Sequence, residues 1–533
     1  IPGRTPWLEG GLLALLVLAV FLLGGEAVRV SYHGTLHATV GEAVLRGGFT
    51  PDNPYHAGES LRYYLLHPGL GAALGRTGIG PFWGFALLNL IGALLFAPAL
   101  DSLGRSLGLG WKARRFSFLA AILAFNGFGW VMGLFGEPLG ERPPLLALSH
   151  ATGTGMDWAW DARLQAFLPK FLNPSSFALA LPFGIWLLAH AANPLAKARQ
   201  AILPAALALA LNPMVGLFCG GVAAIWRAPM LLRGRSRSRW AWPCAGGFGV
   251  LLALPFLWPL LGESPNGPSL FGGFAYSGTP LSNFLGPLFL LLLAAFLAVR
   301  IASNRMWWMV GVGVGCAFLG LLAGPLPWGN EYKFSRLAGL LLALPAGLFL
   351  SNLRCRGNSW PAWGVLALTL PTLGITLAAY LSWDTYPEGL APRWTVKHGR
   401  LAAPGSQVFQ VESGLPSEFP LLVLGDPGGR LRQGISITGN PLAPLLHRSL
   451  VVDDPHIHNA RIPGLKERLQ DRERVRQGDT AALTRLRNVQ SRHSLLVLTD
   501  SEGLEAPALI AAQGEVVAEE GLTTLWLLPP MEG

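Results

Sequence analysis

The sequence predicts an α-helical polytopic membrane protein that ends in a soluble α/β domain. Of its 533 residues, 51% are hydrophobic and only 13% are charged, and the mean hydropathy is +0.42. Apolar runs long enough to cross a bilayer recur as far as residue 382, and acidic residues are scarce before Asp384. A soluble chain could not easily bury that much apolar surface, whereas lipid can cover it. Beyond residue 384 strand-like and helix-like patterns alternate, so we expect the domain boundary there.

The apolar runs predict about eleven transmembrane segments. One run, at 202–226, is interrupted by Asn212 and Pro213. Because proline removes a backbone donor and disfavours helix in the residue before it, we expect two short helices in this run. The other runs each predict one span, the first of them at the amino end. These runs lie near 7–24, 81–101, 116–135, 174–194, 241–261, 284–301, 306–325, 336–352 and 361–382.

Clusters of lysine and arginine in the loops between apolar runs predict the topology. Such clusters are enriched in cytoplasmic loops, which accounts for the net charge of +10 without a nucleic-acid partner. The two clusters that flank 202–226 lie on one side of the membrane only if the chain crosses out and back within that run. The clusters expected in the cytoplasm are 105–115, 197–199, 227–239 and 354–356.

This topology divides the chain into two predicted domains. Residues 1–383 form the transmembrane domain, and its long loops at 25–80 and 136–173 face outward when the amino terminus is cytoplasmic. Residues 384–533 form an extracytoplasmic α/β domain, because an odd number of crossings separates it from the amino terminus. Long, aromatic outward loops usually carry a functional site, so we expect the site on this face.

The first outward loop begins with an acidic residue at the end of the first span. An ionisable group in the position of Glu26 must be hydrated, paired or used in chemistry. Its carboxylate can act as a general base toward an acceptor hydroxyl, and a hydrated interfacial charge is the alternative. His33 and His37 follow four residues apart and can share a helix face, either as ligands for a metal or a substrate or as the polar side of an interfacial helix.

Two acidic residues in the second outward loop are further candidates. Asp157 and Asp161 are separated by a segment that contains Trp158 and Trp160. The aspartates can supply acid–base or metal-binding groups to a site. The alternative is an ordinary aromatic belt, because indole rings favour the membrane interface.

A group of cations precedes the predicted span at 336–352. Tyr332, Lys333 and Arg336 lie on the predicted outward side, where cations are usually sparse. A lipid phosphate or diphosphate explains them, since lysine binds phosphate as a point charge and arginine as a fork. Pairing with Glu331 is the alternative. If they bind a headgroup, replacing both cations should weaken lipid binding more than folding, because exposed ion pairs contribute only about 0–1 kcal/mol.

Several function classes lack their sequence signals. The chain has no Walker loop or dinucleotide fingerprint in a strand-to-helix context, which argues against ATP-driven transport. It shows little sign of the midplane polar residues or inverted repeats of a transporter. Its four cysteines, three in apolar segments and one in a basic loop, suggest neither a disulfide framework nor a zinc site.

The carboxy-terminal sequence alternates between strand and helix patterns. Strand-like strings alternate with helical strings such as IPGLKERLQDRERVRQ and DTAALTRLRNV, a pattern that predicts a small α/β sheet domain. The string VVDDPHIHN could bind a metal, but its spacing matches no strong ligand pattern. The strand-like strings are FPLLVLGD, GISITGN, SLVVDD, HSLLVLTD, GEVVAEE and TTLWLLPP.

Three local strings, PDNPYHAGESLRYY, WDARLQAFLPKFLNPSS and GNEYKFSRLAGLLLALPAG, are similar to segments of large bacterial membrane proteins. These strings and the layout of spans, outward loops and outward carboxy-terminal domain resemble the GT-C superfamily of membrane glycosyltransferases. The resemblance covers most of residues 1–382. It implies a multi-pass protein of the bacterial inner membrane whose acidic residue after the first span, here Glu26, acts as the base. The chain lacks the Asp-Glu or Asp-X-Asp pair that members often carry at that place.

The resemblance implies a transfer of sugar from a polyprenyl-phosphate donor on the outer face of the membrane. Asp157 or Asp161 would then orient the acceptor or a divalent metal, and Lys333 and Arg336, with Tyr332 and His33 nearby, would bind the donor. The partners implied are this lipid-linked donor and membrane lipids. An inactive relative that serves as a scaffold or accessory subunit of a larger membrane complex is the alternative.

Overall fold

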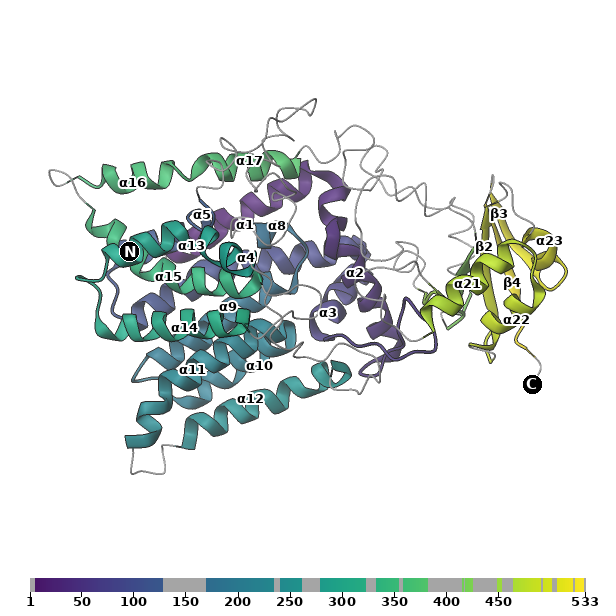
Figure 1. Ribbon diagram of the computed structural model, residues 1–533, viewed down its shortest axis with the longest axis horizontal. Helices are drawn as coiled ribbons and strands as arrows, with labels where there is room; N and C mark the ends of the chain where they lie inside the picture. Colours follow the sequence, from purple (N-terminus) through teal and green to yellow (C-terminus); the bar gives the residue numbers. More distant parts are fainter. Residues whose placement is uncertain are drawn as a thin grey trace. The chain divides into compact units, whose positions relative to one another are not determined.

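A computed structural model describes the chain in segments (Figure 1). Its contacts divide the chain into two units. The first unit comprises Ile1–Leu23, Leu88–Pro255 and Ser269–Ser382, and the second comprises Gly24–Leu87, Phe256–Pro268 and Trp383–Gly533. The described residues are 5–127, 169–233, 240–260, 279–322, 332–353, 358–381, 415–416, 418–424, 448–452, 464–489, 492–500, 506–520 and 523–531.

The first unit is helical. Within the described residues, four helices are long and apolar enough to cross a membrane, and they cover Thr5–Leu23, Phe82–Ser106, Ala241–Leu260 and Lys333–Asn352. The longer helices and the short α8 and α16 follow in chain order: α1 (Thr5–Leu23), α4 (Pro81–Ser106), α5 (Trp111–Leu123), α8 (Pro169–Leu172), α9 (Ser176–Ala192), α10 (Ile202–Leu211), α11 (Pro213–Arg233), α12 (Ala241–Leu257), α13 (Thr279–Leu297), α14 (Asn304–Leu322), α15 (Tyr332–Asn352), α16 (Trp360–Ala367) and α17 (Leu370–Leu381). Short 3-10 turns precede α10 at Ala198–Ala201 and follow α12 at Trp258–Leu260.

The predicted break within 202–226 is confirmed. Asn212 adopts an extended conformation between α10 and α11, and Pro213 starts the second helix. The Asn212 side chain donates to Ser176 Oγ at 2.8 Å and accepts from the Val215 amide at 3.3 Å. The break therefore has its own hydrogen bonds, as a buried helix end requires. The run at 361–382 was expected to form one span, but it divides into α16 and α17; the number of crossings stays a prediction.

Small residues set the close approach of helices in this unit. A Cβ atom added to Gly10 of α1 would lie 2.1 Å from the Leu94 carbonyl oxygen, and one added to Gly92 would lie 2.4 Å from that of Ala178. On α15, a Cβ at Gly347 would collide with Ser117 of α5. Glycine at these positions lets the backbones pack closely, which is how membrane helices commonly associate.

The second unit contains a helix pair and a sheet domain. The pair comprises α2 (Gly25–Gly47) and α3 (Leu66–Leu74), and α3 continues into a π-helical turn at Gly75–Ile79. A Cβ at Gly41 would lie 2.5 Å from the Pro68 carbonyl oxygen, so these two helices touch at the backbone. Residues 48–65, here called the first loop, connect them.

The sheet domain has four strands in the order β1-β2-β4-β3. Strand β1 pairs parallel with β2, and β4 pairs antiparallel with both β2 and β3. The predicted small sheet domain is thus confirmed as a mixed sheet, and the string GISITGN lies outside the described residues. The elements are β1 (Leu421–Val423), α21 (Leu465–Arg476), α22 (Thr480–Asn488), β2 (Leu495–Asp500), α23 (Ala506–Ala511), β3 (Glu515–Glu520) and β4 (Thr523–Leu528).

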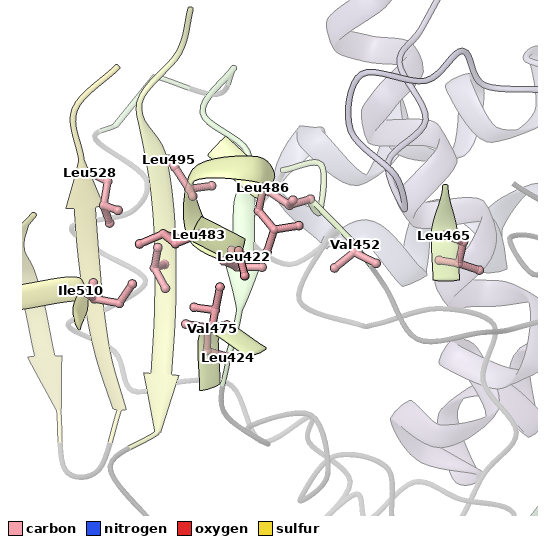
Figure 2. Close-up of a cluster of buried hydrophobic side chains, with 13 residues drawn as sticks. Leu422, Leu424, Val452, Leu465, Val475, Leu483, Leu486, Leu495, Ile510 and Leu528 are labelled. Carbon is pink, nitrogen blue, oxygen red and sulfur yellow. The ribbon is translucent and has the colours of Figure 1, made fainter. Parts of the chain in front are cut away.

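Both faces of this sheet bury apolar side chains. Figure 2 shows Leu422 and Leu495 on one face, against Val475 and Leu483 of the helices. On the other face, alternate strand residues such as Leu496 form a second buried cluster. This alternation follows from the two-residue period of a strand. The predicted domain limits, 1–383 and 384–533, stay a prediction.

Candidate functional site

The predicted site residues fall into three groups. Glu26 and His33 lie on α2 of the second unit, seven residues apart. Two turns of helix separate them by about 10 Å along one face. Their side chains lie outside the described part, as do Asp157 and Asp161 in full. The third group belongs to the first unit and opens α15.

The third group forms the first turns of α15. Tyr332 starts the helix, and Lys333 and Arg336 follow on one face because residues three apart are neighbours. Arg336 is fully buried, with its guanidinium carbon 5.6 Å from the centre of the Phe125 ring. Lys333 is only partly buried. Headgroup binding by Lys333 and Arg336 stays a prediction. Because Arg336 is buried, its loss would also affect folding.

The second unit buries a cluster of polar and aromatic rings between α2 and α3. His37 of α2 lies edge-on to His67 of α3, with ring centres 4.7 Å apart. Tyr63 and Phe85 surround this pair at 6.0 Å and 5.8 Å from His37. Tyr63 stacks in turn on Tyr64, with ring centres 4.3 Å apart. Aromatic contacts at these distances favour one fixed packing of the rings.

His67 stands out within this cluster. It is fully buried, and neither ring nitrogen has a hydrogen-bond partner in the described part of the chain. Burial lowers the pKa of His67 to about 3, because the charged imidazolium loses its hydration. The ring is therefore neutral at physiological pH. It can donate through one nitrogen and accept through the other, but it cannot supply a positive charge.

An ion pair continues from this cluster toward the end of α2. Glu42 is buried, and its carboxylate accepts a 2.6 Å hydrogen bond from Arg76 in the turn after α3. Arg46, one helical turn further, donates to Ser449 Oγ in the sheet domain at 2.9 Å. Burial lowers the pKa of Arg46 to about 10, although Glu42 opposes the shift. Neither arginine is among the predicted site residues; the four-residue spacing of Glu42 and Arg46 is the sequence signal that points to this pair.

The described residues offer no ready metal site. No group of three or more His, Cys, Asp or Glu side chains lies close enough there to hold an ion. His33 and His37 have a ligand-like spacing, but His37 faces His67 and aromatic rings instead.

These features define a class of protein: a multi-pass, α-helical membrane protein with a buried polar helix pair and a mixed-sheet domain. Solved structures of the same architecture exist. ArnT from Cupriavidus metallidurans in the apo state aligns with 96% of this chain and 97% of its own, with a TM-score of 0.51 and 13% identity. The same protein bound to undecaprenyl phosphate gives a TM-score of 0.53 at 13% identity, over 97% and 98% of the two chains.

A second relative in structure is the arabinofuranosyltransferase AftD from Mycobacteria. It aligns with 97% of this chain at a TM-score of 0.53 and 16% identity, but this chain spans only 40% of AftD. No protein-family model and no curated protein matches the sequence. The chain therefore has the fold of the GT-C membrane glycosyltransferases, and the resemblance predicted from its sequence is confirmed at the level of fold.

Proposed function

We propose that this protein transfers a sugar from a polyprenyl-phosphate donor on the outer face of the bacterial inner membrane. The observation that carries the proposal is the nearly full-length likeness to ArnT, which was solved bound to undecaprenyl phosphate. A donor of this kind presents a phosphate at the membrane interface and a long apolar tail to the bilayer. A multi-pass fold with cations at the start of an apolar helix suits both parts.

The roles of the site residues follow from their chemistry. Glu26 serves as the base that accepts the proton of the acceptor hydroxyl, and Asp157 or Asp161 orients the acceptor or a divalent metal. Lys333 binds the donor phosphate, with Tyr332 beside it on α15. Arg336, buried against Phe125, adds positive charge beneath Lys333 and anchors the start of the helix.

Lipid binding and transfer by two variants test these roles. Lys333→Ala should weaken binding of polyprenyl phosphate, because the phosphate loses a charge-assisted partner worth about 1.5–3 kcal/mol, or roughly tenfold or more in affinity. Lys112→Ala, an exposed lysine on α5, is the matched control and should bind normally. Glu26→Gln should abolish transfer and leave lipid binding intact.

The alternative is a catalytically inactive subunit of a larger membrane complex. Wild-type binding and unchanged transfer in both Glu26→Gln and Lys333→Ala would reject the proposed roles. Purification of the wild-type chain as a stable complex that lacks transfer activity would favour the subunit.

The same proposal places the carboxy-terminal domain outside the cytoplasm. A reporter fused after Gly533 should be active only when exported, because an odd number of predicted crossings separates the domain from a cytoplasmic amino terminus. A fusion that is active only in the cytoplasm would contradict this topology.

A further inference from the structure

The sheet of the carboxy-terminal domain does not end at β1. The amide of Leu421 in β1 donates to the Ser449 carbonyl at 2.9 Å, and the Val451 amide donates back to the Leu421 carbonyl at 2.9 Å. Residues 449–451 therefore run alongside β1 as a short parallel segment, here called the edge segment. The Ser449 carbonyl and the Val451 amide face β1, so the amide and the carbonyl of Leu450 point away from β1.

The first loop occupies this outer edge. The Leu450 amide donates to the Pro54 carbonyl at 2.8 Å, and the Leu450 carbonyl accepts from the Ala57 amide at 2.9 Å. Both outward groups of Leu450 are thus satisfied by the loop that follows α2. An unpaired strand edge is a site for pairing with another chain segment, so the loop extends the sheet by main-chain hydrogen bonds.

Two arginines reinforce this junction. Arg468 of α21 donates through one nitrogen to the Ala57 carbonyl at 2.7 Å and to the Val451 carbonyl at 3.1 Å, so it joins the loop to the edge segment. Arg46, at the end of α2, donates to Ser449 Oγ. Gly58, at a positive φ of 85°, fits against Val489, where a Cβ atom would lie 3.2 Å from the valine side chain.

The opposite side of the loop covers α2. Tyr55, Leu61 and Tyr63 of the loop pack with Leu36 and Val40 of the helix in one buried cluster. Apart from a bridge between Asp52 and Ser60, the described loop has no strand or helix of its own. A segment of this kind is ordered mainly by what it binds on its two sides.

We propose that the carboxy-terminal domain positions α2 for the transfer reaction, by holding the first loop closed over the helix through the edge segment and Arg468. The inference rests on the proposed function, because α2 carries the predicted base Glu26. Arg468 is a positioning residue, since it acts through the loop and not on the substrate. The sheet domain thus holds the first loop against α2.

Hydrogen exchange on the full-length protein in detergent tests whether the domain holds the loop. In Arg468→Ala, amides in peptides that cover 54–65 should exchange about tenfold faster or more, because two hydrogen bonds from a charged donor are lost. Peptides covering β2 and β4 should be unchanged, which shows that the domain stays folded. Arg474→Ala is the matched control: Arg474 lies on the same helix, is 57% exposed, and lies 4.0 Å from the carboxylate of Asp471.

A milder variant distinguishes the loss of a contact from misfolding of the domain. Ser449→Ala removes the hydroxyl that accepts from Arg46 and leaves the main-chain pairing intact, so a smaller increase, about threefold to tenfold, is expected in the same peptides. If peptides that cover 54–65 exchange in both variants at the rate of the Arg474→Ala control, the proposal that the sheet domain holds the first loop is overturned.

Steady-state kinetics test whether the sheet domain positions α2 for the transfer reaction. Arg468→Ala should lower kcat about tenfold or more with little change in the KM for the lipid donor, because the base and not the predicted phosphate-binding lysine is displaced. Faster loop exchange with wild-type kcat would refute the positioning role. A wild-type protein without transfer activity would overturn the proposed function and this catalytic part, while the exchange data would still decide whether the domain holds the loop.

Discussion

Acid should destabilise this protein through one buried histidine. His67 is a fully buried residue of α3, a helix outside the four apolar candidate spans. Its pKa in the folded state is about 3, against an ordinary value of 6.5. The unfolded chain therefore binds a proton at His67 below about pH 6.5, whereas the folded protein does not do so until about pH 3. Stability is fully present above pH 6.5 and falls as the pH drops through this window.

The size of the effect follows from the linkage between pKa and stability. Each pH unit within the window costs about 1.4 kcal/mol, so His67 alone should remove about 2 kcal/mol between pH 6.5 and pH 5. Replacing His67 with Met keeps a side chain of similar volume and removes the titrating group. The variant should lose less stability than the wild type when the pH is lowered.

Thermal unfolding in detergent, followed by tryptophan fluorescence, measures this difference. The midpoint of wild type minus that of His67→Met should decrease between about pH 7 and about pH 5, and other titrating groups cancel in the comparison. His493→Gln is the control, because His493 is exposed and its ring stays in water in the folded protein. If the difference in unfolding midpoint between the wild type and His67→Met does not change with pH, the reasoning about His67 is refuted.

Three substitutions test contacts within the units, two in the second unit and one in the first. Gly71→Ala would place a Cβ 2.0 Å from the Phe85 ring and should cost about 1–3 kcal/mol, seen as a lower unfolding midpoint; an unchanged midpoint would mean that α3 and α4 separate easily. Arg448→Met removes a buried donor to three backbone carbonyls and should raise exchange throughout the sheet domain. Asn89→Leu leaves backbone groups at residues 171–175 without their partner and should lower stability by about 1–3 kcal/mol, whereas a neutral effect would argue against this hydrogen-bond network.

Local chemistry explains which helix breaks the sequence could predict. At Asn212–Pro213 the proline removes a donor, and the structure ends α10 there. Pro371 near the start of α17 carries the same signal, and the run at 361–382 is indeed divided. A proline alone does not determine whether a helix breaks, because Pro182 and Pro345 lie inside continuous helices. Neighbouring helices and side chains can satisfy the freed backbone groups, and that tertiary context is absent from a single sequence.

The arrangement of the second unit lay beyond sequence reasoning for a similar reason. Strand patterns predicted a small sheet domain, but not that β4 lies between β2 and β3 or that the first loop extends the sheet. Arg468 and Ala57 are 411 residues apart, and no periodicity links them. We also expect the two long outward loops, at 25–80 and 136–173, to enclose a polar cavity together. This stays a prediction, because most of the second outward loop lies outside the described residues; within the first, residues 48–65 pack on α2 and on the sheet domain.

Turnover of a lipid-linked sugar tests the central claim most directly. The purified wild-type protein, given a set of labelled polyprenyl-phosphate sugars and membrane acceptors, should consume at least one donor and release free polyprenyl phosphate, with no turnover by Glu26→Gln. Both proteins should bind undecaprenyl phosphate equally well. Failure of the wild type to bind this lipid, or equal turnover by Glu26→Gln, would contradict the account.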